Sequence, residues 1–276
     1  MLTLLLLTFF HLPNSISQNI NQCVECASPG LQHRWALTGF SREYGDNLFT
    51  SNCAEAVGWK GFTACDGQCI TYMFEDPDAS YVKDRNLVIR GCLEKLLDED
   101  LSNRQASNTT SSLCEYDKDF QRLNSQGEMI STKVVSIICS GNLCNGRGIT
   151  FEDPCKGYTA DTSASVPIKC YQCQGENENC HTAKKICSKK YCYKGTIDFH
   201  GSKSVYKTCA DFNPFGNSAE CGQFSTQVTP MNTATVQTTV SHCFCNDKPY
   251  CNFAYQSHPF IYQLILVSII LFAIIF

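Results

Sequence analysis

Short runs of β-branched and aromatic residues, separated by turn sequences, fill the last third of the chain before its apolar end. Such runs favour strands, and a turn between two of them predicts a hairpin. His200-Gly201 and the segment from Thr229 to Asn232 are the two turns. The runs that flank them are residues 191–199 with 202–209, and residues 223–228 with 233–241.

The first half shows one further hairpin pattern, around an acidic turn. Residues 70–74 and 81–90 flank Glu75-Asp76-Pro77-Asp78, in which the proline presets the backbone angle that a turn requires. Such an acidic run is typical of a solvated hairpin tip, and it could also meet a cationic partner.

A leucine pattern at helical spacing follows this hairpin. Leu93, Leu96, Leu97 and Leu101 recur as on one face of a helix. We expect a short helix packed on the sheet, and a ligand groove is the alternative. The acidic residues Glu94, Asp98, Glu99 and Asp100 would then face water.

Both ends of the 276-residue chain are strongly apolar. Residues 1–12 are too short for a convincing membrane span, and Ser15 and Ser17 have the spacing of a signal-peptidase site. We therefore predict a signal peptide over residues 1–17.

Residues 260–276 would reach only about 26 Å as a helix, against a hydrocarbon core of about 30 Å, and no Lys or Arg follows them. A polar spacer before such a tail is typical of glycosylphosphatidylinositol (GPI) attachment, which removes the tail. We predict attachment at Asn252, with Ser257 as the alternative site and a single-pass helix as the alternative anchor. Residues 253–276 would be the removed propeptide.

The 20 cysteines indicate an oxidising compartment and a disulfide-held, extracellular fold. They divide equally between two halves, residues 18–155 and 169–252, and residues 156–168, rich in Ser, Thr, Ala and Pro, read as a linker. The two halves therefore need not be rigidly docked. Zinc or redox use of the Cys-x-x-Cys pairs is disfavoured in this setting, so we expect neither a metal nor a cofactor.

The second half resembles a three-finger domain of the lymphocyte-antigen-six/urokinase-receptor (LU) superfamily. The resemblance rests on its opening Cys170-Tyr171-Gln172-Cys173, its ten-cysteine order and the closing Cys251-Asn252. It implies an all-β, disulfide-rich, snake-toxin-like fold. The disulfides that it implies are Cys170–Cys192, Cys173–Cys180, Cys187–Cys209, Cys221–Cys243 and Cys245–Cys251.

The first half resembles the same family with larger insertions, which makes two three-finger domains in tandem. It opens with Cys23-Val24-Glu25-Cys26 and closes with Cys144-Asn145. Ile138 stands where the family has its eighth cysteine, and Cys155 is an extra one. The implied pairs are Cys23–Cys69, Cys26–Cys53 and Cys65–Cys92. Two arrangements remain for the others: Cys114–Cys155 with Cys139–Cys144, which Asn145 favours, or Cys114–Cys139 with Cys144–Cys155.

No catalytic constellation, phosphate loop or basic run is present, so we expect neither an enzyme nor a nucleic-acid-binding protein. The net charge is −4. The histidines of the mature chain are interpreted as surface or turn residues: His33, His181, His200 and His242. Asn108-Thr109-Thr110, in a polar loop over residues 103–112, is the clear N-glycosylation sequon.

The resemblance implies a GPI-anchored binding protein that chaperones or tunes a membrane receptor or ion channel through its fingertips. Relatives of this architecture include invertebrate proteins of olfaction and sleep, and the Arg90-Gly91-Cys92 phrase is similar to theirs. A structural or adhesive role, for example in septate junctions, is the alternative. Tyr81, Phe199 and His200 are the predicted contact residues, because aromatic side chains commonly anchor interfaces.

Overall fold

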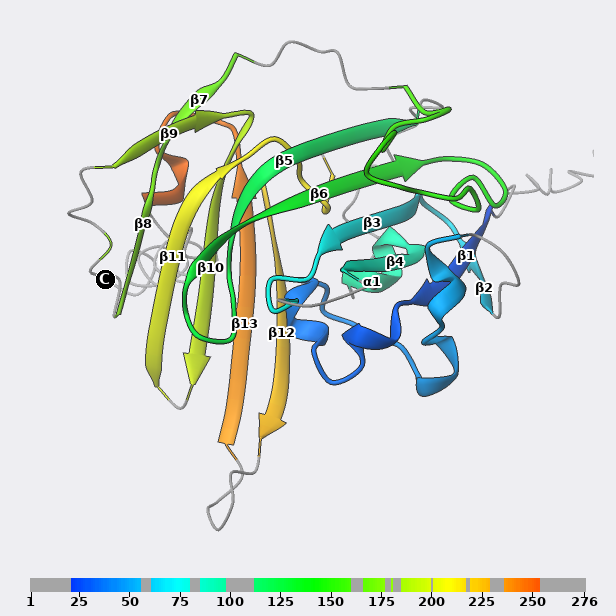
Figure 1. Cartoon of the computed structure of the whole chain (residues 1–276), viewed down its shortest axis with the longest axis horizontal. Coiled ribbons are helices and arrows are strands. Elements are labelled where there is room, and N and C mark those ends of the chain that lie inside the picture. The colour runs from blue at the N-terminus through cyan, green and yellow to red at the C-terminus, as the bar shows by residue number, and fades with distance from the viewer. Residues whose placement is uncertain are drawn as a thin grey trace, which may run out of the picture.

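The structure is a computed structural model, which describes residues 21–55, 61–79, 85–97, 112–159, 166–176, 180, 185–199, 201–216, 219–228 and 236–253. Its described part is built from antiparallel strands and ten disulfides, which confirms the expectation of an all-β, disulfide-rich chain (Figure 1). The predicted signal peptide, most of the predicted propeptide, and Tyr81, Asn108, His181 and His200 lie outside the described residues.

The first half forms a six-stranded sheet in the order β2-β1-β4-β3-β6-β5. Its strands are β1 (Asn21–Ala27), β2 (Gly61–Cys65), β3 (Cys69–Glu75), β4 (Asn86–Cys92), β5 (Leu113–Leu123) and β6 (Met129–Cys139). The hairpin predicted around the acidic turn is β3 with β4.

The second half forms a five-stranded sheet in the order β12-β13-β10-β11-β8, and β7 pairs separately with β9. Both predicted hairpins are present, as β10 with β11 and β12 with β13. The strands are β7 (Ile168–Tyr171), β8 (Cys173–Glu176), β9 (Ile186–Lys189), β10 (Tyr191–Phe199), β11 (Ser202–Ala210), β12 (Glu220–Val228) and β13 (Val236–Cys245).

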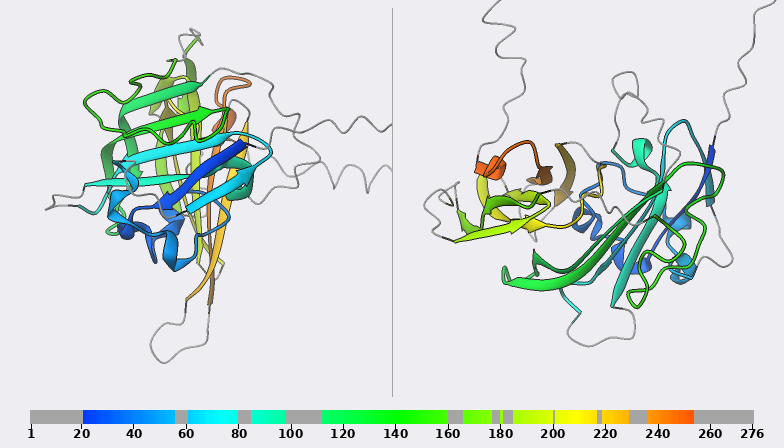
Figure 2. Two further views of the ribbon diagram at one scale, coloured as in Figure 1. Left: turned by 90° about the vertical axis from the view of Figure 1, so that its right-hand side faces the viewer. Right: turned by 90° about the horizontal axis from the view of Figure 1, so that it is seen from above.

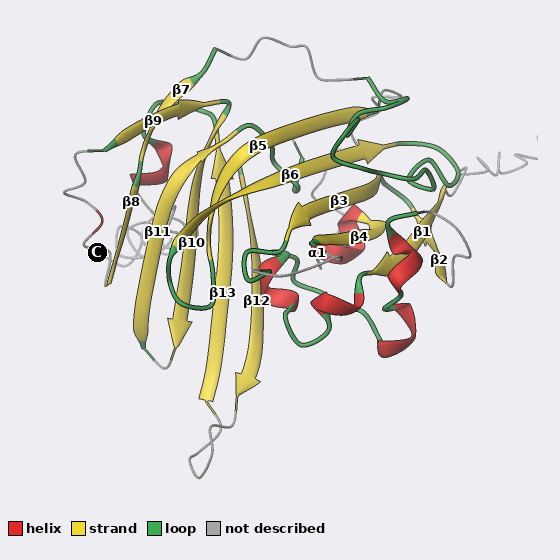
Figure 3. Cartoon of the chain, in the orientation of Figure 1, coloured by secondary structure: helices red, strands yellow, loops and turns green. Residues whose placement is uncertain are grey.

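Within the described residues, helical structure consists of short turns, most of which lie beside β1 and β4 (Figure 3). The first part of the leucine pattern forms α1 (Leu93–Leu97), in which Leu93, Leu96 and Leu97 are buried as predicted, whereas Leu101 and residues 98–100 lie outside the described residues. Glu94 was expected to face water, but it is buried, because its carboxylate accepts a hydrogen bond from the main-chain N–H of Gln68. The 3₁₀ turns are η1 (Pro29–Leu31), η2 (Trp35–Leu37), η3 (Asp46–Leu48), η4 (Ser51–Cys53) and η7 (Cys251–Phe253).

The same four-stranded core occurs in both halves. β4-β3-β6-β5 in the first sheet corresponds to β11-β10-β13-β12 in the second, and the strand registers coincide. Cys69 lies opposite both Cys92 and Cys139, just as Cys192 lies opposite Cys209 and Cys245. This correspondence makes equivalent residues comparable between the halves.

Every cysteine is in a disulfide, and each bond stays within one half. Of the two arrangements considered for the first half, the structure contains Cys114–Cys155 with Cys139–Cys144. The remaining bonds are the pairs that the resemblance implies: Cys23–Cys69, Cys26–Cys53, Cys65–Cys92, Cys170–Cys192, Cys173–Cys180, Cys187–Cys209, Cys221–Cys243 and Cys245–Cys251.

The position of the missing cysteine differs from the one expected. Cys114 lies opposite Ile137 in its hairpin, as Cys221 lies opposite Cys243. Ile137, and not Ile138, therefore occupies the place of Cys243. The prediction placed the missing cysteine directly before Cys139 and was wrong by one residue. In the second half, which has the Cys221–Cys243 bond, Phe244 separates Cys243 from Cys245, so the equivalent position of the first half lies two residues before Cys139.

The two halves lie side by side (Figure 2). One continuous hydrophobic core docks them, although the linker composition predicted that they need not be rigidly docked. Phe120 of β5 meets Tyr193 and Phe212 at ring-centroid distances of 5.2 and 4.9 Å, and Phe40 meets Phe215 at 5.7 Å. All five rings are at most 1% exposed. The composition of a linker predicts only the flexibility of the linker itself. Whether two halves dock depends on the apolar surface that each presents to the other, and here that surface is rich in aromatic rings.

Candidate functional site: the projecting face of the second sheet

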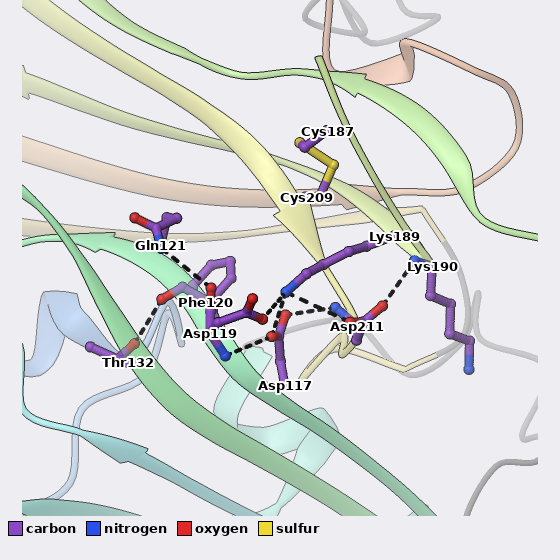
Figure 4. A network of polar contacts seen from close by, with 10 residues as sticks. All are labelled: Asp117, Asp119, Phe120, Gln121, Thr132, Cys187, Lys189, Lys190, Cys209 and Asp211. Atoms are coloured by element: carbon purple, nitrogen blue, oxygen red, sulfur yellow. Dashed lines mark hydrogen bonds and ion pairs between the residues drawn. A yellow bond between two sulfur atoms is a disulfide. The ribbon is translucent and has the colours of Figure 1, made fainter. Parts of the chain in front are cut away.

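An ion cluster holds the two halves together beside the aromatic core (Figure 4). The ammonium of Lys189 lies 2.5 Å from Asp117 and 2.7 Å from Asp119, two carboxylates of β5. Asp117 also accepts a hydrogen bond from the main-chain N–H of Asp211, at 2.9 Å. Burial raises the pKa of Asp117, and the bonds from Lys189 oppose that rise. Burial lowers the pKa of Lys189 by itself, but the bonds to Asp117 and Asp119 outweigh it and raise the pKa overall.

A third carboxylate of β5, that of Glu115, is satisfied almost entirely by the second half. Glu115 accepts from the Tyr191 hydroxyl at 2.9 Å and from the Asn213 main-chain N–H at 2.8 Å, and it pairs with Lys190. Burial raises the pKa of Glu115, against the lowering effect of Lys190. Separating the halves would leave these carboxylates without their cations, and a buried charge that loses its partner is strongly destabilising.

His242 completes the contact from the middle of the second sheet. Its Nε2 lies 3.0 Å from the carbonyl oxygen of Ala36, and its Nδ1 lies 2.6 Å from the hydroxyl of Tyr193. Because a carbonyl only accepts, Nε2 carries the proton and Nδ1 accepts from Tyr193. Burial, and then the charge of Arg122, lower the pKa of His242 to about 4. The expectation that His242 is a surface or turn residue is therefore wrong.

The face of the second sheet that touches the first half can be followed row by row from its register. The first rows contain Tyr193 opposite Phe244, and then His242 between Gly195 and Gly222. These rows are covered, and the fit is close at Gly222, where an added Cβ would lie 2.0 Å from the carbonyl oxygen of Gly39. The first half thus occupies one end of this face.

The same face continues past the first half. Its next rows are Ile197 with Val240 and Phe224, and then Phe199 with Thr238 and Thr226. We call these six residues the tip face. Phe224 is partly buried against the shared core, whereas Phe199 is 45% exposed. The ends of β12 and β13 that carry this face project beyond the first half (Figures 1 and 2).

The third finger of the second half has no charged side chain at all. From Cys221 to Asn246 the sequence contains no Asp, Glu, Lys or Arg and is rich in Thr and Gln. The tip face is therefore uncharged, and its apolar members are Ile197, Phe199, Phe224 and Val240, which suits contact with another apolar surface better than with a charged ligand. The absence of charge was readable from the sequence, whereas the joining of Ile197, Phe224 and Val240 to Phe199 required the strand register.

The predicted site residues fall into three groups. Phe199 is exposed at the end of the central hairpin, as expected. Tyr81, His200 and the sequon Asn108 lie outside the described residues. Asn252 is only 2% exposed, because its side chain bonds to the main chain of Tyr171 and Tyr193. His33 is an exposed residue with a φ of 68°, consistent with a turn.

The acidic turn is not a solvated tip. Arg34 donates to both carboxylate oxygens of Asp76, each at 2.7 Å, and to Asp78 at 2.6 Å. Burial by itself would raise the pKa of Asp76, but the bonds from Arg34 outweigh it and hold the pKa below its ordinary value. The cation that faces the turn is Arg34 of this chain, so the turn braces the segment between β1 and β2.

Two clusters within the described residues have the residue types of a metal site. They are Cys65, Cys92 and Glu94, and Cys245, Asp247 and Cys251. In each cluster the two cysteines are bonded to each other, so neither can offer a thiolate. None of the described helices has the length and apolarity needed to cross a membrane.

Residues 26–146 match the family model described as Caenorhabditis elegans ly-6-related protein. The matched stretch is thus similar to this family. It runs from Cys26 to just past Asn145 and includes the bonds Cys26–Cys53, Cys65–Cys92 and Cys139–Cys144. It lies entirely within the first half. No curated protein and no solved structure matches the chain.

Proposed function

We propose that this protein is an extracellular, cell-surface binding protein that modulates or chaperones a membrane receptor or ion channel through the tip face. The Ly-6-related match of the first half, the complete disulfide set and the absence of a free thiol support an extracellular binding protein. Phe199 carries the proposal. It extends a face that is already used for recognition within the molecule, and it is the exposed end of that face.

The physical case for this surface is its rigidity. Cross-strand bonds and the disulfides Cys187–Cys209 and Cys221–Cys243 fix both hairpins before any partner arrives. A preformed surface loses little conformational entropy on binding, and an aromatic anchor in such a surface typically contributes about 2 kcal/mol or more.

The proposal includes a GPI anchor at Asn252. Attachment uses the main-chain carboxyl of the modified residue, so the buried side chain of Asn252 could keep its hydrogen bonds. The lipid would then join the protein at η7, the last described turn. Phosphatidylinositol-specific phospholipase C should release the protein from intact cells, and a surface form that still contains residues 260–276 would contradict the anchor.

The binding proposal is tested by photo-crosslinking on the native cell. A photoreactive phenylalanine analogue replaces Phe199 in one variant and Phe62, which is 51% exposed on β2, in the matched control. We expect light-dependent adducts with a receptor or channel from position 199 and none from position 62. Adducts with a junctional protein would support the adhesive alternative instead. Equal labelling from both positions, or labelling from Phe62 alone, would refute recognition by the tip face.

A further inference from the structure

We infer that the free edge of β12 pairs with β12 of a second copy of this chain. β12 is the last strand of its sheet, and nine successive residue pairs join it to β13 without a register shift. Among the main-chain hydrogen bonds of the described residues, none joins residues 221–228 to an element other than β13. Gly222 packs against Gly39 of the first half on the face of the sheet, and residues 224–228 continue past this contact, so we take residues 224–228 as the open edge.

Exposed sheet edges pair readily with other strands, and proteins that remain monomeric guard them with charges, prolines or bulges. β12 has none of these guards after Glu220, because residues 221–228 contain no charge and no proline. Gln223, Ser225, Thr226 and Gln227 are exposed along it.

The equivalent strand of the first half shows what a guarded edge looks like. β5 carries Glu115, Asp117, Lys118 and Asp119, and its register shifts between Asp117 and Phe120. The three carboxylates pair with Lys189 and Lys190 of the second half. The edge of β5 is therefore protected from pairing with another strand, whereas the equivalent open edge of β12 has no charge, proline or bulge to prevent it.

The chemistry of β12 fits a second copy better than a charged partner strand. If two copies pair antiparallel about a two-fold axis, residues 224–228 of one β12 lie opposite residues 224–228 of the other. Like charges placed opposite each other would be destabilising, whereas Thr, Ser and Gln can hydrogen-bond to each other. Pairing would join two five-stranded sheets and place two tip faces side by side. The short edge predicts a weak association, which depends on concentration.

The test uses the full secreted chain without any partner protein. We expect sedimentation to show a mass that shifts from one chain towards two as concentration rises, and hydrogen exchange of residues 224–228 to slow over the same range. Exchange in β2, the edge strand of the other sheet, should not change. Thr226→Lys and Ser225→Glu should both abolish the shift, whereas Ala64→Lys on β2 should leave it intact.

Because every readout is taken without cells or a receptor, the result is independent of the proposed function. If a variant does not fold, hydrogen exchange of residues 224–228 in the unmodified chain still tests the pairing of β12. A chain that remains monomeric with concentration-independent exchange overturns the inference, even if β12 pairs with a different protein. Association that survives both Thr226→Lys and Ser225→Glu overturns it as well.

Discussion

Asn145 and Asn252 occupy the same place in the two halves of the molecule. Asn145 accepts a hydrogen bond from the Val24 main-chain N–H at 2.9 Å and donates to the carbonyls of Val24 and Ile70, both at 3.0 Å. Asn252 likewise accepts a hydrogen bond from the Tyr171 main-chain N–H at 3.2 Å and donates to the carbonyls of Tyr171 and Tyr193, at 3.0 and 3.1 Å. Each asparagine directly follows a cysteine of a short disulfide, Cys139–Cys144 or Cys245–Cys251, and ties the first strand of its half to the central one.

Asn145→Asp should destabilise the protein strongly, because it replaces an amide donor with an oxygen that faces two carbonyls. Leaving buried carbonyls unpaired beside a buried charge costs about 3 kcal/mol or more. Asn142→Asp is the matched control, since the exposed side chain of Asn142 acts only as an acceptor towards the Gln22 N–H. Denaturant unfolding of both variants measures the difference, and equal stabilities would contradict the role assigned to Asn145.

Lys189→Ala should cost about 3 kcal/mol, because it leaves the fully buried carboxylate of Asp117 without its cation. Lys133→Ala removes a surface pair with Glu75 at 3.6 Å, in which the Lys133 side chain is 46% exposed, and should cost less than about 1 kcal/mol. Thermal unfolding compares the two variants. A larger loss for Lys133→Ala would show that the ion cluster between the halves does not hold them together.

His242 should make stability depend on pH between about 4 and 6.5. In this range the unfolded chain binds a proton at His242 and the folded chain does not, so the free energy of unfolding falls as the pH is lowered. With a folded pKa of about 4, the full loss is on the order of 3 kcal/mol. His242→Gln should remove this part of the slope, whereas His33→Asn should not change it. An unaltered slope in His242→Gln would contradict the burial of His242 in the neutral form.

Gly222→Ala should disturb the docking of the halves, since the added Cβ would meet the Gly39 carbonyl oxygen at 2.0 Å. Overpacking of this kind typically costs about 1–3 kcal/mol. Gly148→Ala is the control, because its Cβ would lie in ordinary contact, 3.4 Å from the Glu55 carbonyl oxygen. Calorimetry should show a lower melting temperature for Gly222→Ala alone, and matching values would mean that β12 does not lie close to the first half.

The local structure could be predicted because its signals lie close together in the sequence. The hairpin β10 with β11 follows directly from its strand residues and its Gly201 turn. The docking of the halves could not be predicted in this way, because its partners are distant in sequence. His242 is buried by a carbonyl 206 residues away, and Phe120 has no local feature that distinguishes a docking ring from an ordinary core ring. The tip face could be predicted only in part, because Phe199 lies at a visible turn but its neighbours are set by register.

The central claim is that the two halves form one docked unit without a covalent bond between them other than the linker. Inserting a specific protease site into residues 160–165 and cutting it under non-reducing conditions tests this claim directly. At neutral pH we predict that the two fragments remain together and elute as a single particle of unchanged size, and that Lys189→Ala weakens this association. Fragments that separate at once in the unmodified protein would show that the halves are independent, which would contradict the docked arrangement and the tip face that it defines.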